Sequence, residues 1–168
     1  MSRRGKATFD RRDPVTKEVA TRAPASDVKD AISAADPAAA AFHGWAKTGP
    51  SARRAIMNKA VDIMDSKTPD FTALMIKETG STGPWAGFNV FLAANMIREA
   101  ASMPMQITGD IIAANKPGSL AMGMRQARGV CFGMASWNAP VILGVRAAIA
   151  SGNTVVLKAP KCAPQSTI

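Results

Sequence analysis

Two cysteines and one histidine are the residues of this sequence whose side chains could act as strong nucleophiles or metal ligands. Cys131 lies inside a short apolar run, GVCFGMA, and Cys162 lies in a segment near the end of the chain. The two cysteines are not spaced as a C-x-x-C pair, and His43 is distant from both in the sequence. This spacing predicts neither a metal site nor a disulfide framework. We expect Cys131 to be a small buried side chain of a strand.

Asn138 and Lys158 are polar residues that follow two apolar runs. Asn138 belongs to a Trp-Asn-Ala-Pro turn after GVCFGMA, and Lys158 ends the run TVVLK. An asparagine before a proline commonly caps a helix or forms a turn, and a lysine at the end of an apolar strand commonly guards a sheet edge. With His43, they are also candidate donors for chemistry without a redox cofactor, such as an isomerisation, cyclisation or dehydration. Spacing alone leaves the structural and the catalytic interpretation open.

The segment that carries these two residues reads as strand, turn, helix and strand. The run GVCFGMA is followed by the Trp-Asn-Ala-Pro turn, a short helix, Gly152-Asn153 and the strand TVVLKA. A βαβ unit of this kind has parallel strands joined by a right-handed crossover. We therefore expect an open α/β sheet whose ligands lie at the carboxyl ends of the strands.

Before this unit, the hydrophobic pattern of the sequence changes after Pro104 from helical periodicity to the alternation typical of strands. The segments ITGDIIA and SLAMGMRQ flank the turn-rich residues 115–119, which predicts an antiparallel hairpin over about 105–127. Residues 1–24 alternate around Val15 and Val19 with turn residues between them, which predicts an extended arm or short hairpin.

Four helices are expected between the arm and the later hairpin. Pro37 is predicted to kink or restart the first one, because a proline inside a helix removes a backbone hydrogen bond and costs about 3 kcal/mol. The aromatic and other large apolar residues of the fourth helix are expected to be core contacts with no ligand role. Ser26 is expected to cap the first helix, which runs through Val28, Ile32 and Ala35. The second is expected to start at Pro50 with Ser51 as its cap and to carry Ile56, Ala60, Ile63 and Met64 on one face, and the third is marked by the cap Thr68, Pro69, Asp70 and Gly80. The fourth is expected from about Pro84 to Ala101, with Trp85, Phe88, Phe91, Leu92 and Met96 near helical spacing.

The formal charge of +9 does not predict a nucleic-acid partner. Five cations crowd the first dozen residues, and the others scatter along the helices without interleaved aromatic side chains that could stack on bases. The basic N-terminus is not followed by an apolar signal segment, and no apolar run approaches the length of a membrane span. We expect a cytoplasmic protein with no nucleic acid and no membrane among its partners. The crowded cations are Arg3, Arg4, Lys6, Arg11 and Arg12.

One long segment and four motifs upstream of it, in the family's order, resemble the aldehyde dehydrogenase superfamily, especially its salicylaldehyde- and vanillin-type members. The strongest is RGVCFGMASWNAPVILGVRAA followed by GNTVVLKAP, which resembles the first βαβ unit of the family's cofactor domain. The resemblance covers about residues 9–164 and implies a truncated α/β fold: N-terminal helices, a β-hairpin of oligomerisation type and one incomplete Rossmann-like unit. It divides the chain into an arm, 1–24, and an incomplete cofactor-binding domain, 25–168. The other motifs are Asp13-Pro14-Val15-Thr16, Phe42-His43-Gly44-Trp45, the Arg53-Arg54 helix and Lys77-Glu78-Thr79-Gly80.

The resemblance also implies roles for individual residues. The family asparagine that donates to the aldehyde oxygen as it becomes an oxyanion corresponds to Asn138. Trp137 and Ala135-Ser136 would line the nicotinamide side, and Lys158 would hold the adenosine ribose of NAD or NADP. Where the family usually has an acidic residue that accepts from this ribose, the chain has Lys161, which cannot accept but would attract a 2′-phosphate.

Two further departures from the family pattern bear on activity. The helix after Asn138 is about three residues short, which would shift the downstream strand unless a loop absorbs the change. The family's thiol nucleophile and glutamate base are not matched, since Cys131 lies in a strand and Glu78 and Glu99 lie on helices.

The resulting expectation is a truncated aldehyde dehydrogenase-like protein that does not oxidise aldehydes by itself. The family oxidises aromatic or other small aldehydes with NAD(P). The alternatives are a pseudoenzyme that pairs with a full-length relative or another protein through the hairpin over 105–127, and a cofactor-independent biosynthetic catalyst. The expected assembly is a homo-oligomer or a complex with another chain. Because two parallel strands leave an unpaired edge and an uncovered apolar face, we expect a partner chain, a rearranged sheet or poor stability in isolation.

Overall fold

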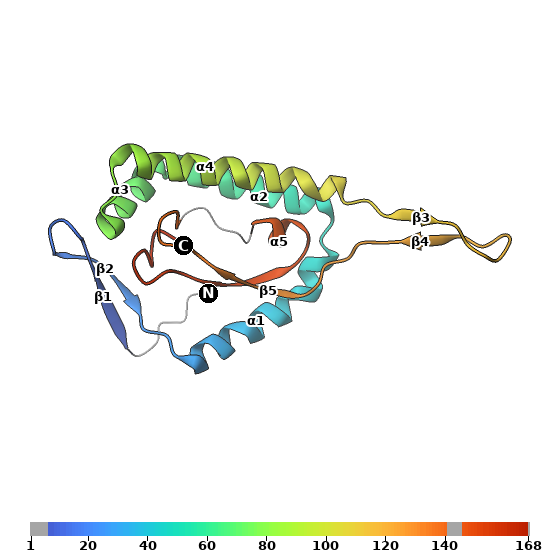
Figure 1. The fold of residues 1–168 in the computed structure, drawn as a ribbon, viewed down its shortest axis with the longest axis horizontal. Helices are drawn as coiled ribbons and strands as arrows, with labels where there is room; N and C mark the ends of the chain where they lie inside the picture. The colour runs from blue at the N-terminus through green and yellow to red at the C-terminus, as the bar shows by residue number, and fades with distance from the viewer. Residues whose placement is uncertain (1–6, 141–145, 168) are drawn as a thin grey trace.

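The computed structural model describes residues 7–140 and 146–167, and these form a mixed α/β fold, as the sequence predicts. Long helices frame two sides of the molecule, and a pair of strands lies between them (Figure 1). A narrow two-stranded arm projects from one end (Figure 1). The elements are β1 (Thr8–Arg12), β2 (Val19–Pro24), α1 (Val28–Lys47), α2 (Pro50–Ser66), α3 (Thr68–Thr79), α4 (Gly83–Ser102), the 3-10 turn η1 (Met103–Gln106), β3 (Asp110–Ile112), β4 (Ala121–Gly123), β5 (Val130–Met134), α5 (Arg146–Ala150) and β6 (Thr154–Lys158).

Helix α1 is one uninterrupted helix with Pro37 inside it, so the predicted restart at this residue is wrong. Pro37 and Asp36 are exposed, so the backbone carbonyl that loses its intrahelical partner is close to solvent. The helix is capped by Asp27 instead of Ser26. The Asp27 side chain accepts from the Asp30 backbone N–H, and the Asp30 side chain accepts from that of Asp27, which makes a capping box.

Prolines mark the starts of the next helices, but the expected hydroxyl caps are not used. Helix α2 begins at Pro50 with Gly49 as its cap and no side-chain cap bond, so Ser51 is not the cap. Helix α3 begins at Thr68 after the cap Lys67, and Thr68 makes no cap bond. A proline in the first turn presets the helical φ and needs no donor there, which makes a side-chain cap less necessary.

The core lies between α2, α3 and α4 and is built mainly from small residues and methionines. The buried stripe of α2 is Arg53, Met57, Val61 and Met64. Ile56 and Ile63 are half exposed, so only Met64 of the predicted α2 face is in the core. On α4 the alanines face α2 and α3, and the aromatic residues that the sequence predicts as core contacts lie outside: Trp85, Phe88 and Phe91 are 45%, 47% and 64% exposed. Small residues at the interface let the helices approach closely and turn the large side chains outward.

The strands form three separate two-stranded sheets within the described residues. The pairs β1–β2 and β3–β4 are antiparallel, and β5–β6 is parallel, which confirms the two hairpins and the parallel strands of the βαβ unit. A wider open sheet is not formed by these strands. Helix α1 packs on β5 and β6, while the other face of β5 exposes Phe132 and Met134.

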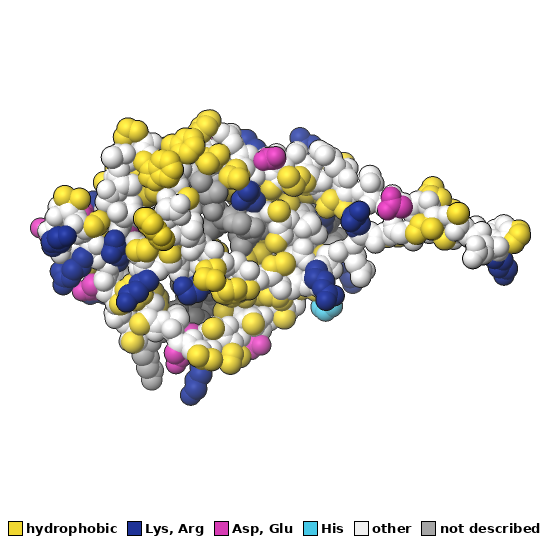
Figure 2. All heavy atoms as spheres, viewed as in Figure 1, with side chains coloured by type: hydrophobic (Ala, Val, Ile, Leu, Met, Phe, Trp, Pro, Cys, Tyr) yellow, Lys and Arg dark blue, Asp and Glu magenta, His cyan; other side chains and the backbone are white. Residues whose placement is uncertain are grey.

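Apolar side chains remain on the surface where this chain offers no cover. Figure 2 shows them along α4 and on the arm made by β3 and β4. Ile111 and Met122 of the arm are 80% and 60% exposed. The uncovered apolar face expected of the two parallel strands lies on β5, where Phe132 and Met134 are 65% and 70% exposed.

Gly80 ends α3 at a position where glycine is required. Its φ is 71°, and a Cβ there would lie 2.6 Å from Cγ of Pro14 in the turn between β1 and β2. This close approach fastens the turn containing Asp13-Pro14 to the end of α3.

Replacing Gly80 by alanine should lower the free energy of unfolding by about 2 kcal/mol, because a left-handed conformation costs a non-glycine residue about 1–2 kcal/mol and the new Cβ displaces Pro14. Gly44→Ala is the matched control: Gly44 lies within α1 with open space around it, so alanine should stabilise the helix by about 0.5–1 kcal/mol. Urea unfolding measures both. Equal shifts of the two midpoints would contradict this role for Gly80.

Candidate functional site

The carboxyl ends of β5 and β6 lie side by side and bring most of the predicted site residues to one edge. Met134 is paired with Lys158 in the parallel register, and the backbone N–H of Ala135 donates to the carbonyl of Lys158 at 3.0 Å. Lys158 is exposed, and its Nζ donates to the neighbouring Ala159 carbonyl at 3.5 Å, its one hydrogen bond within residues 7–140 and 146–167. Its ammonium therefore has donors to offer a ligand at this edge.

The loop that leaves β5 carries Ser136, Trp137 and Asn138, all of which are exposed. The indole N–H of Trp85 on α4 donates to the backbone carbonyl of Asn138 at 3.3 Å. Phe88 lies against Trp85, with ring centroids 5.7 Å apart. These two aromatic residues, predicted to be core, therefore lie beside the loop that carries the candidate oxyanion donor. The helical spacing of Trp85 and Phe88 predicts that they share one face of α4, but it does not predict that this face is exposed.

Lys161 lies beyond the strand end, against the β1–β2 hairpin. Its Nζ is 6.0 Å from the centroid of the Phe9 ring, and the side chain is exposed. At this distance the cation–π attraction is weak and leaves the ammonium free to meet an anion. Two exposed cations, Lys158 and Lys161, thus mark the segment that leaves β6.

Asn153 fixes the opposite ends of the same strands. Its Oδ1 accepts from the backbone N–H groups of Arg128 at 2.6 Å and Gly129 at 3.0 Å, just before β5. Its Nδ2 donates to the carbonyl of Ala148 and to Oγ of Ser151, both at 3.2 Å. One buried amide therefore joins the end of α5 to the start of β5.

Two further motif residues hold the end of α5. Arg53 on α2 is buried, and its Nε donates to the Ala150 carbonyl at 2.9 Å, while its Nη1 donates to the Thr48 carbonyl. The indole N–H of Trp45 donates to the Ile149 carbonyl at 3.0 Å. The last carbonyls of a helix have no partner within it, so these side chains satisfy groups that would otherwise be buried unpaired.

The shorter crossover helix predicted from the sequence is compatible with regular pairing of β5 and β6. The strands keep a regular register from Val130 opposite Thr154 to Met134 opposite Lys158. Helix α5 is described from Arg146, and residues 141–145, where the predicted helix would begin, lie outside the described residues, as do Arg3, Arg4 and Lys6.

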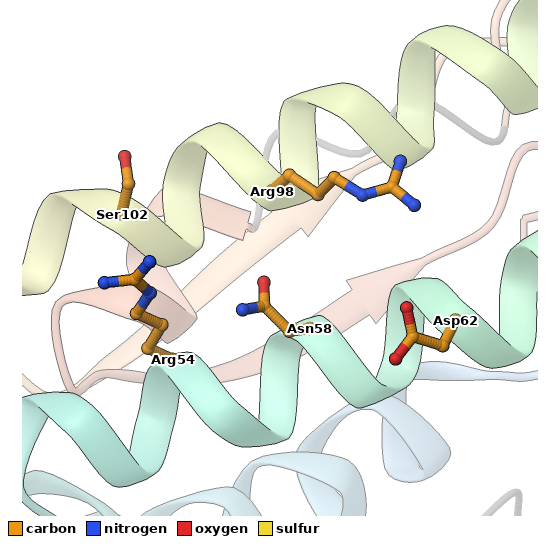
Figure 3. Close-up of a pocket in the computed structure, with 5 residues that line it drawn as sticks. All are labelled: Arg54, Asn58, Asp62, Arg98 and Ser102. Atoms are coloured by element: carbon orange, nitrogen blue, oxygen red, sulfur yellow. The ribbon is translucent and has the colours of Figure 1, made fainter.

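A polar groove between α2 and α4 contains none of the predicted site residues. Its volume is about 460 Å³ and its walls come from one ridge of each helix (Figure 3). Arg98 pairs with Asp65 at its rim, and the lining contains both signs of charge, so we assign it no ligand. The lining residues are Arg54, Asn58 and Asp62 from α2 and Arg98 and Ser102 from α4.

The remaining reactive side chains do not gather at the strand edge. His43 is exposed on α1 beside Phe42, and Cys131 is half-buried within β5, less enclosed than expected. Across residues 7–140 and 146–167, the His, Cys, Asp and Glu side chains form no group of three that could hold a metal ion. Among the helices described, none is long and apolar enough to cross a membrane.

Comparison with known proteins points to one family. The profile described as "Aldehyde dehydrogenase family" matches residues 1–168. A vanillin dehydrogenase from Pseudomonas sp. (strain HR199 / DSM 7063) is 52% identical over 160 residues, which are 94% of this chain and 33% of that protein. The crystal structure of a salicylaldehyde dehydrogenase from Pseudomonas putida G7, complexed with salicylaldehyde, superposes with a TM-score of 0.92 at 41% identity, covering 96% of this chain and 34% of that one. An NAD-dependent benzaldehyde dehydrogenase from Corynebacterium glutamicum gives a TM-score of 0.90 at 30% identity over 96% and 36% of the two chains. The chain thus spans about a third of the length of these relatives.

Asn153→Ala should lower the free energy of unfolding by about 2 kcal/mol, because the part-buried backbone N–H groups of Arg128 and Gly129 lose their acceptor, while the Ala148 carbonyl keeps the Asn153 backbone N–H. Asn58→Ala, a change of the same size in the open groove, should stay within about 0.5 kcal/mol of the unaltered chain. Urea unfolding followed by circular dichroism compares them. Similar losses for both variants would show that the Asn153 bonds do not hold the unit together.

Proposed function

The chain belongs to the aldehyde dehydrogenase family, and from this premise we propose that its β5–β6 edge forms the part of an aromatic aldehyde site that binds NAD(P) and the aldehyde oxygen. The relatives named for vanillin and salicylaldehyde favour an aromatic aldehyde as the substrate class. The observation that carries the proposal is the adjacency of the two strand ends, because it brings the Asn138 loop and Lys158 to one edge.

Asn138 is the proposed donor to the aldehyde oxygen. A fixed amide aimed at an oxygen that gains negative charge stabilises the transition state more than the ground state, by about 3–4 kcal/mol in comparable sites. The backbone of Asn138 is held by Trp85, and Trp85 and Phe88 offer an aromatic surface beside it. An aromatic aldehyde ring can stack on such a surface while its carbonyl points to the amide.

Lys158 and Lys161 are the proposed partners of the cofactor's adenosine half. The exposed ammonium of Lys158 fits a ribose hydroxyl, and that of Lys161 fits the 2′-phosphate of NADP, since a lysine can donate but not accept. Ala135, Ser136 and Trp137 would border the nicotinamide, whose chemistry is to take up hydride from the substrate. The fit favours NADP over NAD.

The cysteine and glutamate residues that could serve as nucleophile and base are not placed for aldehyde oxidation, so we propose that this chain does not oxidise aldehydes by itself. Covalent oxidation needs a thiolate within reach of the carbonyl and a base that activates water. Cys131 is paired into β5. Both carboxylate oxygens of Glu78 already accept hydrogen bonds inside the fold, and Glu99 is exposed on α4. We therefore propose a binding half-site in a cytoplasmic protein, without nucleophile or base among the described residues.

A second candidate function is partner binding through the β3–β4 arm. The arm projects from the body and exposes Ile111, Ile112, Leu120 and Met122, with unpaired strand edges on both sides (Figure 1). Such an edge can pair with a strand of a second copy or of another chain.

Ile111→Lys should abolish co-elution with such a chain, while Ile63→Lys on α2 should not.

Lys161→Gln should weaken NADP binding about tenfold and leave NAD binding nearly unchanged, because one charge-assisted hydrogen bond of about 1.4 kcal/mol is lost. Lys158→Gln should weaken both cofactors, and Lys116→Gln, in the turn of the arm, should affect neither. Titration monitored by tryptophan fluorescence gives the dissociation constants. Equal weakening of NAD and NADP by Lys161→Gln would contradict the 2′-phosphate assignment.

The purified 168-residue chain should form no reduced cofactor when incubated with vanillin or salicylaldehyde and NAD or NADP. Absorbance of the reduced nicotinamide measures turnover, and a full-length aromatic aldehyde dehydrogenase is the positive control. Steady turnover that disappears in Asn138→Ala would show that the chain carries a nucleophile that we have not recognised.

A further inference from the structure

Glu78, near the end of α3, is a fully buried carboxylate that the proposed function does not use. Its Oε1 accepts from Oγ1 of Thr21 at 2.5 Å and from the backbone N–H of Gln165 at 3.2 Å. Its Oε2 accepts from the backbone N–H and the Oγ of Ser166, at 2.9 and 2.5 Å. Four donors offset the large cost of burying this group, and a glutamine would fit poorly, because its amide nitrogen would face a backbone N–H, that of Gln165 or that of Ser166, whichever way the amide is turned.

The donors come from two places distant in the sequence. Thr21 belongs to β2, whereas Gln165 and Ser166 belong to the segment that leaves β6. That segment is itself folded: Ala163 and Pro164 are buried, and Oγ1 of Thr167 donates to the Ala163 carbonyl at 2.9 Å. With the Ala163 N–H donating to the Pro160 carbonyl at 3.2 Å, these contacts connect the Ser166 end of the segment to the residues beside Lys161.

The segment between Lys158 and Ser166 is held at both ends. At one end Lys158 is paired with the strand edge through Ala135, and at the other Ser166 is bound by Glu78. Pro160 and Pro164 restrict the backbone between these anchors. Fixing both ends of a short, stiff segment removes most of its conformations, so its side chains are placed before a ligand arrives.

We propose that Glu78 is a positioning residue for cofactor binding: through Ser166 it fixes the segment that presents Lys158 and Lys161. This inference rests on the proposed function, because it assigns Glu78 a part in arranging the NADP site. Glu78 touches no ligand in this account. It lowers the entropy cost of binding by holding the segment in place.

Two hydroxyls at the same carboxylate provide the test. Ser166→Ala removes one of the three donors on the segment side and leaves the two backbone N–H donors in place, whereas Thr21→Val removes the single donor on the hairpin side; each lost hydroxyl makes a 2.5 Å bond to Glu78. Both should lower the urea midpoint. Ser166→Ala alone should raise the NADP dissociation constant about fivefold and speed amide hydrogen exchange across residues 159–165, while exchange in β5 and β6 stays slow.

Equal changes in NADP affinity for the two variants, or unchanged exchange across 159–165 in Ser166→Ala, would overturn the inference and leave Glu78 a purely stabilising group. Absence of NADP binding by the unaltered chain would instead overturn the proposed function, and the positioning role with it. If Ser166→Ala does not fold, Ser166→Thr and Ser166→Val are compared, since they match in shape and differ in the hydroxyl. The threonine variant should retain affinity and protection, and equal behaviour of the two would count against the inference.

Discussion

The buried carboxylate of Glu78 is the interaction on which the arrangement of this chain depends. It joins three segments that are widely separated in sequence, because its two oxygens bind β2 through Thr21 and the segment after β6 through Gln165 and Ser166. The backbone carbonyl of the same residue accepts from Nε of Arg11 on β1 at 2.7 Å. An uncompensated charge at this depth would cost several kcal/mol, so the hairpin, α3 and the end of the chain are stable only as a set.

Polar side chains also determine how the βαβ unit sits on the helices. Arg53 and Trp45 bind the last carbonyls of α5, and Asn153 joins that end to the start of β5. The core between the helices is made of alanines, methionines and valines, which fill space but specify few directions. Directional bonds at the junctions therefore set the register of β5 against β6, and through it the adjacency of the Asn138 loop and Lys158.

Local signals in the sequence predicted local structure well. Gly80, the two hairpins and the parallel strands follow from turn residues and apolar runs that act over a few positions. Exposure could not be predicted in the same way: the period of α4 showed that Trp85 and Phe88 share a face, but the opposite face, made of alanines, is the one that packs. The role of Glu78 was missed because its partners lie 57 and 88 residues away. The site residues stay predictions that rest on family resemblance, since spacing alone favoured caps and strand ends.

Cofactor binding at the β5–β6 edge can be located by mapping amide chemical shifts of the isotope-labelled chain during titration with NADP. We expect saturable shifts confined to the loop over residues 135–138, the end of β6 and the segment through Lys161. Shifts centred on the polar groove of Arg54 and Arg98, or none at saturating cofactor in a folded sample, would contradict this expectation.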